Sequence, residues 1–250
     1  MTITNKCYPF QKQLSDSRGK TSTYHQFVNI PLINFISTLP QRVLDIGCAG
    51  GKLGAVLKTK YPNVYVAGIE PNADAAKQAS HYLDNVIHGT FESINLKEQN
   101  IVPHSFDTVI LSDVIEHIYN PWEMMIQLKK WMTKDAQILL SVPNIQNLRI
   151  LEDVYLYGSW KYQTQGLLDV THIRFFTRKS IEQLLNDTGY QVFRIESVID
   201  QEFEQLFNHS RNHTSINIEL EKITIKEVSP EDVENFCAYQ FLIHAVLTHE

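Results

Sequence analysis

Two carboxylates and an imidazole fall close together in the stretch Asp113-Val-Ile-Glu116-His117. The stretch begins where a buried strand over 106–111 is expected to end. If a helical turn starts there, the spacing i, i+3 and i+4 places all three polar side chains on one face. Such a group suits either general base catalysis or a site for a hard divalent metal ion.

A second stretch with functional character is the glycine-rich segment 43–54. Its first apolar residues predict a short buried strand, which is then interrupted by Gly47, Gly50, Gly51 and Gly54. Glycine permits a tight turn with unusual backbone angles, or lets a ligand lie directly on the backbone. A helix is expected from about residue 52, so this turn predicts a ligand pocket rich in N–H donors. Asp45, a carboxylate at the end of the buried strand, favours the pocket because an ordinary turn does not need it.

Alternating strands and helices must position these residues. Apolar runs predict strands at 42–47, 64–69, 84–88, 106–111 and 137–142. Helical patterns fall at 24–39, 52–60, 72–82, 121–132 and 178–188. Continuous apolar strands between helices indicate a parallel sheet covered on both faces. With two closing strands at 191–198 and 236–247, the prediction is an α/β fold with a Rossmann-like, seven-stranded, mostly parallel sheet.

Three polar features follow three of these strands. They are the turn at 47–51, Glu70, and the pair Ser112 and Asp113. Ligands of parallel sheets bind at the carboxyl ends of the strands, near the point where the strand order reverses. We therefore expect these features to lie at one edge of the sheet and to form one site.

The whole chain of 250 residues is predicted to be one domain. An N-terminal arm and helix span 1–40, and the ligand-binding core spans 42–143. A helical cap over the site is expected at 144–176. The polar, charged segment 200–232 is interpreted as an insertion.

The segment Asp45-x-Gly47-x-Ala49-x-Gly51 resembles the glycine motif of class I S-adenosylmethionine-dependent methyltransferases, with alanine at the middle glycine. The resemblance extends to about residue 190. It implies that the loop backbone lies against the methionine part of the cofactor and that Glu70 binds both ribose hydroxyls. A carboxylate suits that role because it accepts two hydroxyl protons at once. The implied cofactor-binding residues are Asp45, Gly47, Cys48, Ala49, Gly51, Glu70, Pro71, Thr90, Phe91, Ser112 and Asp113.

The adenine end of this implied site departs from the family pattern. Related enzymes usually carry an acidic residue after the third strand, where this chain has Thr90. Thr90 or a backbone group is expected to replace that contact, and Phe91 to pack on the adenine ring. A dinucleotide dehydrogenase is disfavoured for the loop, because Asp45 would repel a pyrophosphate but suits the cationic amino group of S-adenosylmethionine.

The segment Thr171-His-Ile-Arg-Phe-Phe-Thr177 resembles one found in bacterial small-molecule and sugar methyltransferases. The resemblance implies that His172 faces the site opposite His117. We predict His117 as the catalytic base, with His172 and Glu116 orienting it or helping to hold a metal. Small-RNA 2′-O-methyltransferases, which the order of these elements also resembles, hold a metal with a similar acidic pair and histidines. A purely structural role for the group stays open, as does the identity of any metal.

Composition limits the classes of partner. The net charge is −6, and no Lys/Arg cluster longer than a pair occurs, so nucleic-acid binding is not expected. Three widely separated cysteines argue against a disulfide framework. The absence of a signal peptide or apolar span predicts a cytoplasmic protein with no membrane span. A homodimer is left open.

The sequence thus predicts a methyltransferase that transfers the methyl group of S-adenosylmethionine to an oxygen of a small molecule, such as a saccharide or a phenol. One alternative is a non-catalytic regulatory subunit that binds S-adenosylmethionine. Another is an RNA 2′-O-methyltransferase, which the acidic charge disfavours. The cap aromatics Tyr155, Tyr157, Trp160 and Tyr162 are interpreted either as an acceptor-stacking surface or as packing.

Overall fold

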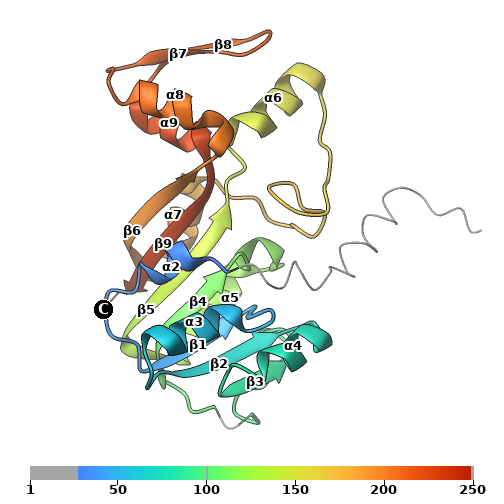
Figure 1. The fold of residues 1–250 in the computed structure, drawn as a ribbon, viewed down its shortest axis with the longest axis vertical. Coiled ribbons are helices and arrows are strands. Elements are labelled where there is room, and N and C mark those ends of the chain that lie inside the picture. Colours follow the sequence, from blue (N-terminus) through green and yellow to red (C-terminus); the bar gives the residue numbers. More distant parts are fainter. Residues whose placement is uncertain (1–27, 100, 249–250) are drawn as a thin grey trace, which may run out of the picture.

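A seven-stranded sheet forms the centre of the computed structural model, which describes residues 28–99 and 101–248 (Figure 1). The strand order is β3-β2-β1-β4-β5-β9-β6, and only β9 runs antiparallel to its neighbours. The strands are β1 (Arg42–Ile46), β2 (Tyr65–Glu70), β3 (Asn85–His88), β4 (Phe106–Ser112), β5 (Met132–Pro143), β6 (Tyr190–Ile199) and β9 (Ala238–Leu247). The predicted Rossmann-like fold is confirmed.

The register of the three central strands brings the polar features to one edge. Ile46 of β1 pairs with Ile69 of β2 on one side and with Leu111 of β4 on the other. The residues that follow these three in the chain are Gly47, Glu70 and Ser112. They therefore lie next to one another at the carboxyl edge of the sheet. The strand order reverses between β1 and β4, which is where a ligand is expected in this fold.

Two apolar layers hold the helices against the sheet. Helices α5 (Pro121–Leu128) and α7 (Arg178–Asp187) pack on one face through Met124, Met125 and Leu184. On the other face, α2 (Ile30–Ile33), α3 (Lys52–Lys60) and α4 (Ala73–Ala79) join a second cluster with side chains from the central strands. Because both faces are covered, the central strands β1, β2 and β4 are buried along nearly their whole length, as their continuous apolar runs predicted.

A smaller unit lies beyond one end of the sheet (Figure 1). It contains α6 (Leu148–Tyr157), η3 (Gln201–Phe203), α8 (Glu204–Ser210), the hairpin β7 (Ile216–Glu219) and β8 (Thr224–Val228), and α9 (Pro230–Cys237). Leu148 of the cap helix shares one apolar cluster with Ile218, Val228 and Val233. The predicted cap and the predicted insertion are thus packed together around a common small core.

Several predicted element boundaries are wrong. The helix expected at 24–39 is, within the described residues, only the four-residue α2. The helix expected at 121–132 ends at Leu128, and β5 begins at Met132 rather than 137. The first two residues of the strand expected at 236–247 belong to α9 instead. Residues 1–27, which include most of the predicted arm, lie outside the described part of the chain.

None of the helices in the described ranges 28–99 and 101–248 has the length and apolar character needed to cross a bilayer. The η2 turn (Ile115–His117), a single 3₁₀ turn, follows β4 directly. This short element places two of the predicted catalytic residues at the carboxyl edge of the sheet.

Candidate active site

A cavity of about 1360 Å³ opens along the carboxyl edge of the sheet. It is larger than the roughly 300–1000 Å³ of a typical small-molecule site, so it has room for two ligands side by side. The cavity is lined by all of the residues predicted for the site except Gly51: Asp45, Gly47, Cys48, Ala49, Glu70, Pro71, Thr90, Phe91, Ser112, Asp113, Glu116, His117 and His172. Strand ends, the η2 turn and the cap loop bring these side chains together.

The glycine loop is held in an unusual backbone conformation. Gly47 has φ +74° and Gly51 has φ +78°, values that favour glycine. A Cβ at Gly51 would lie 2.8 Å from the Cα of Ala79 in α4, so a side chain there would collide with backbone. Gly51 does not line the cavity, and its role is to let the loop and α3 pack closely against α4. Ala49, with φ +47°, adopts the left-handed region in spite of its methyl group.

Glu70 joins two segments that surround one end of the cavity. Its Oε2 accepts a hydrogen bond of 2.9 Å from the backbone N–H of Ala49, and its Oε1 accepts one of 2.7 Å from the N–H of Asn72. The side chain of Asn72 caps α4 by accepting from the N–H groups of Asp74 and Ala75. The carboxylate that was predicted for the ribose therefore also fixes the glycine loop to the start of α4.

Asp45 lies below this loop and is almost completely buried. Burial, and secondarily the negative charge of Glu70, raises the pKa of Asp45 to about 7. Its Oδ2 has no hydrogen-bond partner within the described residues. A cationic group placed in the cavity above Asp45 would favour its ionised form and satisfy that oxygen. The neighbouring thiol of Cys48 is also buried, and burial raises its pKa well above the usual range.

The residues predicted for adenine differ in their surroundings. Thr90 follows β3 and its hydroxyl donates to Ser93 Oγ over 3.1 Å. Phe91 lines the cavity but also belongs to the main apolar core, where it is buried. Phe91 thus presents part of its ring to the cavity while packing holds the rest in place.

Asp113 does not join the group that its spacing predicted. It precedes the η2 turn with φ +54°, so the helical i, i+3, i+4 geometry does not include it. Its oxygens accept instead from Gln240 Nε2 at 3.1 Å and from Ser112 Oγ at 3.4 Å. Burial raises the pKa of Asp113 above its ordinary value, and hydrogen bonds with Ser141, Gln240 and Ser112 offset only part of that rise. Asp113 is part of a polar chain that ends at Asn29, which donates to Gln240.

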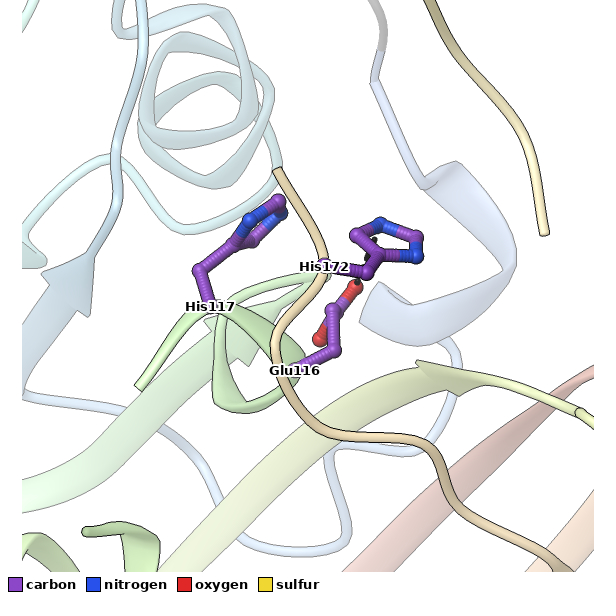
Figure 2. A group of neighbouring side chains, drawn as sticks. All are labelled: Glu116, His117 and His172. Atoms are coloured by element: carbon purple, nitrogen blue, oxygen red, sulfur yellow. Dashed lines mark ion pairs between the residues drawn. The ribbon is translucent and has the colours of Figure 1, made fainter. Parts of the chain in front are cut away.

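Glu116, His117 and His172 form a compact group (Figure 2). Within the part of the chain that the structure describes, they are a set whose ligand-type atoms all lie within 4.8 Å of one another. His172 Nε2 lies 3.9 Å from Glu116 Oε1, and the two imidazoles meet edge to face with ring centroids 4.8 Å apart. His172, which was predicted to face the site opposite His117, lies directly against it and lines the same cavity.

Both imidazoles are oriented by backbone carbonyl groups. His117 Nδ1 lies 3.0 Å from the carbonyl oxygen of Thr171, and His172 Nδ1 lies 3.1 Å from that of Leu167. A carbonyl only accepts, so each Nδ1 carries a proton, and in the neutral form of each ring the lone pair is on Nε2. An Nε2 lone pair is what a general base needs, and it is also what a metal ligand needs.

The donor set fits a divalent metal ion. Two imidazoles and one carboxylate are a common ligand set for transition metals with open coordination positions. The hydrogen bonds from Nδ1 to carbonyl groups are those expected around metal-bound histidines. Glu116, His117 and His172 are therefore the residues that would hold a metal here.

Some cavity residues escaped the sequence-based prediction. They are Asn29, Gln165, Gly166, Asp169, Tyr239 and Gln240, among others. Most come from segments without a recognised motif, and Tyr239 and Gln240 come from the last strand of the sheet. The Asp-x-Thr spacing at 169–171 was a usable signal, because it is typical of a turn in which the carboxylate accepts from the following backbone.

The cap aromatics are exposed and outside the cavity lining. Tyr155 and Tyr157 are 72% and 55% exposed, and Tyr157 donates to Glu221. Trp160 packs edge to face on Phe175 at 5.3 Å. These side chains therefore do not line the cavity described above, and Trp160 and Tyr157 contact neighbouring residues.

Comparison with known proteins places the chain in a family. Residues 23–195 match the family described as methyltransferase domain. The chain belongs to that family. The expected resemblance to class I methyltransferases is confirmed at this level, whereas the narrower relation suggested by the segment 171–177 stays a prediction.

Solved structures support the same fold. A SAM-dependent methyltransferase from Archaeoglobus fulgidus has a TM-score of 0.59 at 20% identity, covering 93% of this chain and 98% of that one. Another from Aquifex aeolicus has a TM-score of 0.55 at 12% identity, covering 96% and 100%. These likenesses concern the fold.

Curated relatives include ubiquinone biosynthesis O-methyltransferases. The mitochondrial protein of Rattus norvegicus is 28% identical over 215 residues, which are 82% of this chain and 57% of the relative. The protein of Neisseria meningitidis is 27% identical over 136 residues, which are 52% of this chain and 56% of the relative. The chain spans about half the length of these two relatives.

Proposed function

We propose that this methyltransferase domain transfers the methyl group of S-adenosylmethionine to an oxygen atom of a small-molecule acceptor. The observation that carries the proposal is a cavity lined by two chemically different groups of residues. Asp45, Glu70 and the glycine loop form the first group, and Glu116, His117 and His172 form the second. The family match and the names of the curated O-methyltransferase relatives support the same reaction.

The first group of lining residues suits a cationic nucleoside. S-Adenosylmethionine supplies a methyl group already activated by a positive sulfonium. In this proposal Glu70 accepts from two ribose hydroxyls, and Asp45 accepts from the amino group of the methionine part. Acidic side chains elsewhere in the lining favour a cation further: Glu92, Asp113, Glu116, Glu123 and Asp169.

The second group of lining residues suits an acceptor hydroxyl that must lose its proton. His117 Nε2 carries the lone pair and takes that proton, since Nδ1 is committed to the Thr171 carbonyl. The remaining work of the protein is to align the acceptor oxygen with the methyl group and to exclude water from the cavity. Phenols and saccharides are acceptor classes with hydroxyl groups of this kind.

Isothermal titration calorimetry tests the cofactor assignment. S-Adenosylmethionine is expected to bind the wild type and to lose most of its affinity in Glu70→Ala, because the ribose contact and the loop anchor both disappear. The Asp84→Ala variant, which removes an ion pair with Lys58 outside the cavity, is the control and is expected to bind normally. Unchanged binding in Glu70→Ala contradicts the assignment.

Turnover tests the reaction. Methylation of a panel of phenols and saccharides is expected with the wild type and to fall by roughly 10²–10⁴-fold in His117→Ala, the usual contribution of a general base. Wild-type turnover in that variant rules out His117 as the base. Absence of any methylation in the wild type favours a regulatory subunit that only binds the cofactor. Salt-sensitive RNA binding would favour RNA 2′-O-methylation instead.

A second candidate is a metal-assisted form of the same reaction, favoured by the donor set of Glu116, His117 and His172. A divalent metal would lower the pKa of a bound hydroxyl and orient it. Calorimetry with Mn²⁺ alone is expected to show binding that Glu116→Gln and His172→Ala each weaken. Equal rates with and without a chelator would leave His117 as a metal-free base.

A further inference from the structure

The cap loop at 169–174 is bound tightly to the turn that carries the catalytic residues. The backbone N–H groups of Ile173 and Arg174 both donate to the carbonyl of Glu116 at 3.0 Å. The side chain of Arg174 donates to the carbonyl of Tyr119 through Nε, at 3.0 Å, and through its terminal nitrogen. The geometry of the site therefore depends on the conformation of this loop as well as on the end of β4.

Asp169 fixes the start of that loop. It is a carboxylate with only 1% of its surface exposed. Its Oδ1 accepts from the backbone N–H of Thr171 at 2.9 Å and from the Thr171 hydroxyl at 2.7 Å. Its own carbonyl accepts from the backbone N–H of His172 at 2.9 Å. A buried carboxylate with these bonds locks the turn in one conformation.

The conformation of this turn directs one carbonyl group toward His117, the predicted base. The carbonyl oxygen of Thr171 is the group that lies 3.0 Å from His117 Nδ1. That contact keeps the proton on Nδ1 and the lone pair on Nε2. A ring freed from it can adopt the other neutral tautomer, in which Nε2 carries the proton and accepts none.

We propose that Asp169 is a positioning residue for His117, acting through the Thr171 carbonyl to hold the imidazole in its Nδ1–H tautomer. The inference rests on the proposed function, in which His117 Nε2 takes the proton of the acceptor. Asp169 itself needs no contact with the acceptor for this role. It links the cap loop, which carries the turn, to the base at the end of β4.

Three variants separate this role from a general structural one. Asp169→Ala removes the acceptor of both Thr171 bonds. Asp169→Asn keeps an oxygen at Oδ1 for both of them. Thr171→Val removes only the hydroxyl bond and keeps the backbone N–H and the carbonyl group. The loss of the Nδ1–H form of His117 and of kcat is therefore expected to be largest in Asp169→Ala and smaller in Thr171→Val. Asp169→Asn should stay close to the wild type.

The direct measurement is ¹⁵N NMR of the His117 ring in protein saturated with S-adenosylmethionine, assigned with a His117→Gln variant. We expect the Nδ1–H form in the wild type and in Asp169→Asn, and a large share of the Nε2–H form in Asp169→Ala. The kcat for the acceptor selected from the phenol and saccharide panel should fall roughly 10- to 100-fold in Asp169→Ala, as for other residues that orient a functional histidine. The affinity for S-adenosylmethionine is expected to stay within about twofold, since the side chain of Asp169 bonds within the cap loop and that of Glu70 bonds to the glycine loop and the start of α4.

The outcomes are distinguishable. An Asp169→Ala protein in which His117 keeps the Nδ1–H form overturns the inference, whatever its activity. A shift to the Nε2–H form with unchanged kcat leaves the positioning role intact and overturns the base role of His117 in the proposed function. If Asp169→Ala does not fold, Thr171→Val decides, because a wild-type tautomer population in that variant contradicts the inference.

Discussion

Glycine is required at Gly51 for two separate physical reasons. The backbone angle φ of +78° is strained for any residue with a Cβ, and the Cβ would lie 2.8 Å from the backbone of α4. At Gly158, the C-cap of α6, φ is +58° but nothing lies within 4 Å of the added Cβ. The two positions therefore share the conformational penalty, and only Gly51 adds a collision.

Substitution by alanine is expected to distinguish the two costs. Gly158→Ala should lower the free energy of unfolding by about 1 kcal/mol, the penalty of the left-handed conformation. Gly51→Ala should lower it by about 2–4 kcal/mol, since close backbone contact adds the cost of overpacking. Urea denaturation measures both values. Equal losses in the two variants would mean that the loop moves away from α4 at little cost.

The burial of Asp45 is expected to make the stability of the protein depend on pH. Its pKa is about 7 in the folded protein and near 4 in an unfolded chain, so the folded state holds the proton more tightly. The stability that this proton contributes is complete below about pH 4 and is lost as the pH rises to about 7. Without ligand, the free energy of unfolding should therefore be higher at pH 5.5 than at pH 7.5.

The matched control is Asp45→Asn, whose amide side chain does not titrate in this pH range. The difference in unfolding free energy between the wild type and this variant is expected to change with pH between 5 and 7 and to be constant above about 8. Urea denaturation at intervals of half a pH unit gives the comparison. Parallel pH profiles of the two proteins would show that Asp45 has an ordinary pKa.

Sequence patterns predicted the position of Glu70 in the site, but they predicted the wrong neighbours for Asp113. Glu70 was predictable because it ends an apolar strand, and its position follows from the strand register. Asp113 was assigned to the wrong neighbours, since the spacing argument assumed a helical turn and the residue instead adopts φ +54°. The bonds of Asp113 reach Gln240, which lies 127 positions along the chain, a separation that no local pattern reveals.

At the scale of elements, strands were easier to predict than their boundaries. The helix expected to run to residue 132 ends at Leu128, although no glycine or proline follows it before β5. The exposed residues Lys134 and Asp135 concealed the first part of β5, whose Met132 pairs with Phe106 at the start of β4. The strand is buried again from Ala136, where its apolar run made the pattern visible.

One buried side chain joins several elements. Asn144, at the end of β5, donates from Nδ2 to the carbonyls of Asn235 and Ala238, at 2.7 and 2.9 Å. Its Oδ1 accepts from the N–H of Gln146 at 3.0 Å. Asn144 thus connects the central sheet to the junction of α9 and β9 and to the beginning of the cap.

Loss of this side chain is expected to be costly. Asn144→Ala should lower the free energy of unfolding by about 1–3 kcal/mol, because the buried carbonyl of Asn235 loses its side-chain donor. Asn217→Ala is the control, since Asn217 is exposed and accepts only from the N–H of Glu227 over 3.0 Å. The control should change stability by less than about 0.5 kcal/mol. Similar losses in both proteins would show that the bonds of Asn144 contribute no more than a surface contact.

At the scale of the whole molecule, the cavity draws on distant parts of the chain. Its lining runs from Asn29 to Gln240 and includes the sheet edge, the η2 turn and the cap loop. The cap helix is in turn packed against the unit at 200–237 through Leu148. The association of cap and insertion was not predictable, because it depends on contacts between segments of mixed polarity with no shared period.

A ligand that fills such a cavity is expected to stabilise the whole fold. Binding to the folded state alone adds about 2.7 kcal/mol at a ligand concentration of 100 times Kd. For a chain of this size that corresponds to a rise in Tm of roughly 5–10 °C. Differential scanning fluorimetry with S-adenosylmethionine measures it, and Glu70→Ala, which should bind weakly, is expected to show little or no rise. Adenosine lacks the cationic methionine part. If the Tm of the wild type rises with S-adenosylmethionine but not with adenosine, stabilisation requires the positive charge above Asp45. Equal rises in Tm with both ligands would contradict that electrostatic role.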